Sequence, residues 1–127
     1  MRQPNLLSMF GILFALFALA AASAVGVKPP ATFVKKGNHV ECPGSQGSMF
    51  TGPRGGHWGI MCGTDTRSTT YFSGPFSGLN FEECIVKCGK TDVCQIATYT
   101  GACYLKLGNK NQGYIKAPGV RTAIKLN

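Results

Sequence analysis

Six cysteines are the residues of this 127-residue chain whose type and spacing best suit chemistry. Four of them follow the spacing C-x3-C-x5-C-x8-C, and two precede that run: Cys84, Cys88, Cys94 and Cys103, with Cys42 and Cys62 upstream. Thiols in such a pattern form disulfides or hold zinc. Zinc bound by Cys84, Cys88 and one of His39 or His57 is the competing interpretation, but no C-x2-C or H-x3-5-H pair supports it. We therefore predict three disulfides, no metal site and no cofactor.

A predicted helix orients the first two cysteines of the run. Asn80 can cap its start, and Glu83 can complete a capping box. Gly89 is expected to end the helix in a left-handed conformation. The spacing i, i+3, i+4, i+7 places four apolar residues on one face of this helix: Phe81, Cys84, Ile85 and Cys88.

This helix limits the disulfide pairing. Cys84 and Cys88 point the same way from consecutive turns, so they suit two partners on a facing sheet better than each other. Cys94 lies just past the helix end and can meet Cys88, and Cys103 can return beside it to meet Cys84. Cys42 and Cys62 are then left for each other, by elimination alone.

Alternation and turn residues predict the strands around the helix. Strands are expected at five places: Ser48–Thr51, residues 57–62, residues 93–99, Cys103–Leu107 and residues 120–126. Residues 64–77 are polar and irregular, and we expect them to form a long loop.

The N-terminal residues resemble an export signal. Arg2 precedes the apolar residues 6–20, and Ala22-Ser23-Ala24 is an A-x-A cleavage site. The alternative, a transmembrane anchor, needs a longer apolar run. We expect residues 1–24 to be a signal peptide, 25–40 an extended lead-in and 41–127 one domain. The mature chain would be secreted and extracellular, with no transmembrane segment.

The charge of the chain is strongly basic and unevenly distributed. The net charge is +8, and no acidic residue follows Asp92. Five basic residues do follow it: Lys106, Lys110, Lys116, Arg121 and Lys125. Such a tail favours acidic polymers or anionic surfaces, and simple solubility is the alternative. The strands at residues 93–99 and Cys103–Leu107 are expected to form a hairpin with a turn at residues 100–102. If the last strand pairs near this hairpin, these charges form one patch.

The pattern Leu79-x-x-Glu-Glu-Cys84-Ile-x-x-Cys88, then Cys94, Tyr99 and Cys103-Tyr-Leu-Lys106, resembles the PAN/apple domain. Cys42-Pro and Cys62-Gly-Thr-Asp65 resemble the version found in small secreted fungal proteins. The resemblance implies an α+β fold, with a single α-helix packed on a curved antiparallel sheet of about five strands and disulfides from the helix to the central hairpin. It also implies a non-catalytic module that binds proteins or carbohydrates. Animal apple domains often have a further disulfide between their termini, and no cysteine follows Cys103 here.

No catalytic residues are predicted. His39, Glu41, Arg54 and His57 have the types needed for a ribonuclease, but their spacing is arbitrary. The chain also lacks the G-x-S-x-G motif of serine hydrolases.

Binding residues are expected among exposed aromatic and polar side chains, because rings bind sugar faces and polar groups bind hydroxyls. Core packing is the alternative for each ring, and we favour it for Trp58 and Tyr99. The candidates are Asp65, Arg67, Tyr71, Phe72, Tyr104, Lys106, Arg121 and Lys125.

The sequence therefore predicts a monomeric secreted binding module. Its partner would be an extracellular polysaccharide, including an acidic polymer, or a protein, and no nucleic acid is expected. A cell-wall-associated or effector-like role in a fungus follows from the resemblance. The alternative is a basic antimicrobial or membrane-active protein, which only the charge supports.

Overall fold

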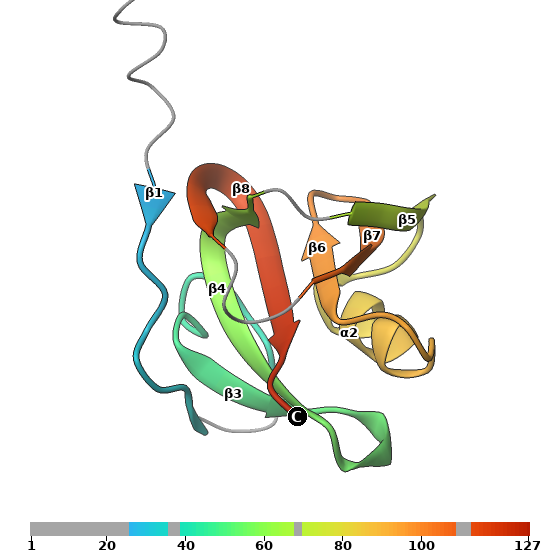
Figure 1. The fold of residues 1–127 in the computed structure, drawn as a ribbon, viewed down its shortest axis with the longest axis horizontal. Coiled ribbons are helices and arrows are strands. Elements are labelled where there is room, and N and C mark those ends of the chain that lie inside the picture. Colours follow the sequence, from blue (N-terminus) through green and yellow to red (C-terminus); the bar gives the residue numbers. More distant parts are fainter. Residues whose placement is uncertain (1–25, 36–38, 68–69, 109–112) are drawn as a thin grey trace, which may run out of the picture.

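The computed structural model describes residues 26–35, 39–67, 70–108 and 113–127, so the expected signal peptide and Lys110 lie outside the described residues. The described elements are β1 (Gly26–Val27), β2 (Val34–Lys35), β3 (Ser48–Thr51), the 3-10 turn η1 (Pro53–Gly55), β4 (His57–Thr66), β5 (Thr70–Phe76), the helix α2 (Phe81–Gly89), β6 (Ile96–Tyr99), β7 (Cys103–Leu107) and β8 (Tyr114–Lys125). The fold class is α+β, with one helix and an eight-stranded sheet in the described part of the chain (Figure 1). That sheet has more strands than the resemblance implies. No helix in these residue ranges is long and apolar enough to cross a membrane.

Strand β8 is the centre of the sheet. The strand order is β2-β3-β4-β8-β6-β7-β5, and β1 also pairs with β8. Because β8 is covered on both faces, the consecutive residues Thr122, Ala123 and Ile124 are all buried. Ala123 belongs to the core beneath the helix, and Ile124 belongs to a second core on the opposite face. The strand predicted at residues 120–126 is longer than expected, because β8 begins at Tyr114, and it is buried on both faces only at residues 122–124.

Helix α2 covers the first core. The Glu83 backbone N–H donates to Asn80 Oδ1 at 2.8 Å, and the Asn80 N–H donates to Glu83 Oε1 at 2.9 Å, so the predicted capping box is present. The predicted left-handed cap at Gly89 is wrong, because Gly89 is the last helical residue and Lys90 caps in a right-handed conformation. The Lys90 N–H reaches the Val86 carbonyl at 3.1 Å, which continues the right-handed turn.

Three disulfides tie the helix and the first half of the chain to the sheet. They join Cys84 to Cys103 and Cys88 to Cys94, the pairs that the helix geometry predicts, and Cys42 to Cys62, the pair predicted by elimination. Both helix cysteines are therefore bonded and cannot be zinc ligands. Within the described residues, no group of three or more His, Cys, Asp or Glu side chains could hold a metal ion.

The lead-in packs on the second core, which is formed by Met61, Ile96, Tyr114 and Ile124. Val27 and Phe33 pack against this core, and the lead-in and α2 lie on opposite sides of β4 and β8 (Figure 1, blue and yellow). A Cβ on Gly59 would lie 2.8 Å from three atoms of the Phe33 ring, so the ring rests directly on the β4 backbone. Burial in this core also raises the pKa of Tyr114 above 10.0. Residues 26–35 are therefore an integral layer of the fold.

Replacing Gly59 with alanine is expected to displace Phe33 and loosen the lead-in. Overpacking of this kind costs about 1–3 kcal/mol of unfolding free energy, which urea denaturation would measure. In a Phe33→Ala background the same change should cost much less, because the ring that it displaces is gone. An equal cost in both backgrounds would show that the ring does not rest on Gly59.

Candidate functional site

Strand β5 occupies part of the segment that we expected to be a long loop. It forms an edge of the sheet and pairs with β7 through two register irregularities, which hide its alternation in the sequence. Gly74 allows this close approach, because its φ is +118° and a Cβ there would lie 2.5 Å from the Cys103 carbonyl oxygen. The pairing places Tyr71 directly opposite Lys106.

A hollow of about 280 Å³ lies where β4, β5, β6 and β7 come together. Its lining residues are Asp65, Tyr71, Thr98, Thr100, Tyr104 and Lys106. The structure thus brings together four of the eight residues predicted to bind a ligand. Two further lining residues, Thr98 and Thr100, were not predicted. For Thr98 the reason is that only the strand register shows that it shares a face of the sheet with Tyr104.

A nearly buried ion pair forms the polar side of the hollow. Lys106 Nζ donates to Asp65 Oδ1 at 2.9 Å and to Thr66 Oγ1 at 3.2 Å, and the Lys106 side chain is only 11% exposed. An ammonium group has three hydrogens, so one has no acceptor among the described residues and can be donated to a ligand. Asp65 Oδ2 accepts no hydrogen bond from the described residues. The pair can therefore offer a ligand one donor and one acceptor.

Two tyrosine rings form the apolar side of the hollow. The Tyr71 and Tyr104 ring centroids are 5.6 Å apart, and the planes meet at 65° in an edge-to-face contact. The Tyr71 hydroxyl donates to the Gly74 carbonyl, which holds the ring on its own strand. Because Tyr71 is 49% exposed, much of its surface is available for contact with a ligand.

Thr98 adds a polar group that no other described residue binds. Its side chain is buried, and its hydroxyl has no hydrogen-bond partner among the described residues. Leaving a buried polar group unpaired costs about 1–3 kcal/mol, and such groups are rare in folded proteins. Thr122, its register partner on β8, instead donates to the Thr64 carbonyl at 2.8 Å.

The other four predicted residues lie outside the hollow. Phe72 is exposed on β5 but does not line it. The Arg67 side chain lies beside Gly113 and Gly26. Arg121 and Lys125 lie on β8 and do not line the hollow. The strand register shows which face of the sheet they project from.

The expected single basic patch is wrong, although β8 does pair with the hairpin strand β6. Lys106 is opposite Ile96, and Ile96 is opposite Ile124, so these three side chains share one face of the sheet. Arg121 and Lys125 are an odd number of residues from Ile124, and they project from the other face. Lys106 is therefore on the opposite face of the sheet from Arg121 and Lys125.

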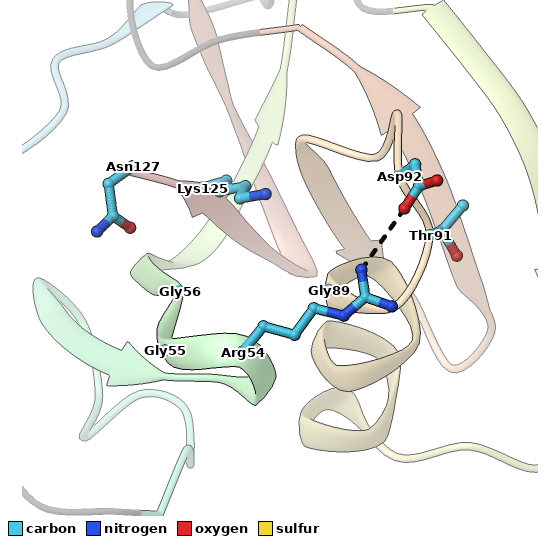
Figure 2. A pocket seen from close by; sticks show the side chains of 8 residues that line it. All are labelled: Arg54, Gly55, Gly56, Gly89, Thr91, Asp92, Lys125 and Asn127. Atoms are coloured by element: carbon cyan, nitrogen blue, oxygen red, sulfur yellow. Dashed lines mark hydrogen bonds and ion pairs between the residues drawn. The ribbon is translucent and has the colours of Figure 1, made fainter.

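Lys125 instead lines a separate pocket of about 340 Å³ at the end of α2. Figure 2 shows Arg54 reaching across the end of the helix towards Asp92, with 3.5 Å between Nη1 and Oδ1. Both partners are exposed, so solvent screens this ion pair. The pocket thus combines Lys125 and Arg54 with the opposite charge of Asp92.

The residues considered for a ribonuclease are not gathered in one pocket. His39 and Glu41 are 3.8 Å apart and line a surface hollow of their own. Arg54 lines the pocket of Figure 2. The His57 ring lies 3.1 Å from the side-chain amide of Asn127.

The hollow on the β5 side thus combines two rings, a neutralised ion pair and a hydroxyl without a partner. Groups of this kind suit a ligand that has both apolar faces and hydroxyl groups. A comparison of the chain with known protein families, curated proteins and solved structures finds no significant match.

Proposed function

We propose that the protein is a secreted, non-catalytic module that binds extracellular carbohydrate in the hollow between β4, β5, β6 and β7. The observation that carries this proposal is the meeting of Tyr71 and Tyr104 with the Lys106–Asp65 ion pair in one site. A sugar ring presents C–H groups to an aromatic face and hydroxyls at its edge. The two tyrosines match the first property, and the ion pair matches the second.

The resemblance to PAN/apple domains supports the same proposal. It rests on the cysteine spacing and on the Cys-Tyr-Leu-Lys motif at Cys103–Lys106, which supplies two lining residues of the hollow, Tyr104 and Lys106. The two disulfides from α2 are of the kind that the resemblance implies. Three disulfides and the leader-like residues 1–24 support an oxidising, extracellular location. A cell-wall-associated or effector-like role in a fungus extends the proposal.

Removing the Tyr71 ring is expected to lower the affinity for a bound glycan about tenfold or more, which corresponds to about 1.4 kcal/mol. The oxidised protein is first screened against glycans and polysaccharides. A glycan that binds is then titrated into wild type and into Tyr71→Ala, and the two affinities are compared. Phe72→Ala is the matched control, because Phe72 is a neighbouring exposed ring outside the hollow.

Equal losses in the two variants would show that the hollow is not the site. Absence of any glycan binding would remove the carbohydrate proposal. Leakage of anionic lipid vesicles by the same protein would instead support the membrane-active alternative.

A further inference from the structure

We infer that the hollow selects a neutral sugar, and that the Thr98 hydroxyl hydrogen-bonds to one of the sugar's hydroxyl groups. This inference rests on the proposed function, because it concerns the ligand of the same site. It names the class of carbohydrate and adds a residue that determines specificity.

The charges of the lining residues favour a neutral ligand. Lys106 is the one cation that lines the hollow among the described residues, and Asp65 neutralises it at 2.9 Å. A uronic acid or sulfate drawn to Lys106 would bring its own negative charge close to the Asp65 carboxylate. The negative charge of the ligand and that of the Asp65 carboxylate would repel each other strongly, because like charges close together in a partly buried site are poorly screened by water. Sugar hydroxyls can instead accept from Lys106 and donate to Asp65 with no added charge.

The position of Thr98 indicates where the ligand reaches deepest. Thr98 is 2% exposed and lies directly opposite Tyr104, on the face of the sheet that carries the hollow. Its hydroxyl is unpaired among the described residues. A sugar hydroxyl is both a donor and an acceptor, so it can satisfy this group whichever way the threonine hydroxyl is turned.

Thr122 provides a direct comparison for Thr98, because it is a threonine in the neighbouring strand that does have a hydrogen-bond partner. The two threonines are register partners in neighbouring strands and are equally buried. The Thr122 hydroxyl donates to the Thr64 carbonyl, and Thr122 does not line the hollow. Thr122 therefore has a structural hydrogen bond, whereas Thr98 lines the hollow and its buried hydroxyl has no partner among the described residues.

The test compares Thr98→Val with Thr122→Val. Each change removes a hydroxyl and keeps a β-branched side chain of similar size. We expect Thr98→Val to bind neutral glycan about tenfold more weakly and to melt at the same temperature as wild type or higher. Thr122→Val should melt at a lower temperature and keep its affinity.

The probes are neutral oligomers of glucose, mannose, galactose and N-acetylglucosamine, with oligogalacturonate and heparin fragments as acidic counterparts. Binding of a neutral oligomer should change little between low and high salt, because no net charge is matched. Preference for an acidic oligomer, or a steep loss of binding with salt, would overturn the inference.

Failure of the inference can be told apart from failure of the proposed function. If Tyr71→Ala abolishes binding of a neutral oligomer but Thr98→Val binds like wild type, the role of Thr98 is wrong and the site stands. If Tyr71→Ala binds every probe like wild type, or if no probe binds, the proposed function fails as well.

Discussion

Replacing Cys84 and Cys103 together with alanine is expected to lower the free energy of unfolding by about 4–5 kcal/mol, near the upper end of the range for small secreted domains. The same replacement of Cys42 and Cys62 is expected to cost about 2–3 kcal/mol. The two disulfides form a matched pair, because they close loops with sequence separations of 19 and 20. The entropy lost by the unfolded chain is therefore nearly the same for both.

The expected difference comes from packing. Cys84 and Cys103 are completely buried between α2 and the hairpin, and their removal leaves a cavity in the first core. Cys42 and Cys62 are partly exposed at the margin of that core, where solvent can fill the space.

Urea denaturation of the two double variants, followed by circular dichroism, measures the difference. Peptide mapping without reduction should confirm that the remaining two disulfides form in each variant. Equal losses would mean that loop closure alone accounts for the effect, and a larger loss at Cys42–Cys62 would contradict the role of the helix contact.

Trp58→Ala is expected to cost about 3–5 kcal/mol. Trp58 is 1% exposed, it lies opposite Phe50 on β3, and it belongs to the core beneath α2. Its loss should leave the largest cavity that a single substitution can make in this core.

Trp58→Phe separates the size of the ring from its polar group. The Trp58 Nε1–H is buried without a hydrogen-bond partner in the described part of the chain, so phenylalanine removes an unsatisfied donor while it keeps an aromatic ring. We expect a cost of only about 1 kcal/mol. Circular dichroism is the appropriate measurement, because Trp58 is the only tryptophan and its fluorescence is lost in both variants. Equal costs for the two variants would show that the indole N–H has a bonded role.

The elements that depend on near neighbours in the chain could be predicted from the sequence. Capping by Asn80 and Glu83 and the apolar face of α2 involve residues three and four positions apart. The same periodicity aims Cys84 and Cys88 at the following hairpin, which is why their disulfide partners could be predicted. Strands β3 and β7 have the bounds that alternation and turn residues predict.

The elements that depend on distant pairing could not be predicted. Strand β5 contains irregularities that only its contact with β7 stabilises. The lead-in becomes a layer of the fold because Gly59 leaves room for the Phe33 ring. The separation of Lys106 from Arg121 and Lys125 depends on strand register, because a shift of one residue moves a side chain to the opposite face.

The sequence by itself therefore determined the residue types of the candidate site, together with the helix and the disulfides. Only the tertiary structure decided which of those residues meet. Asp65 and Lys106 are 41 positions apart, and their ion pair forms because β4, β5, β6 and β7 come together around one hollow. No pattern of near neighbours encodes that meeting, because it arises from the register between strands. The same is true of the Thr98 hydroxyl, which has no partner in the described part of the chain.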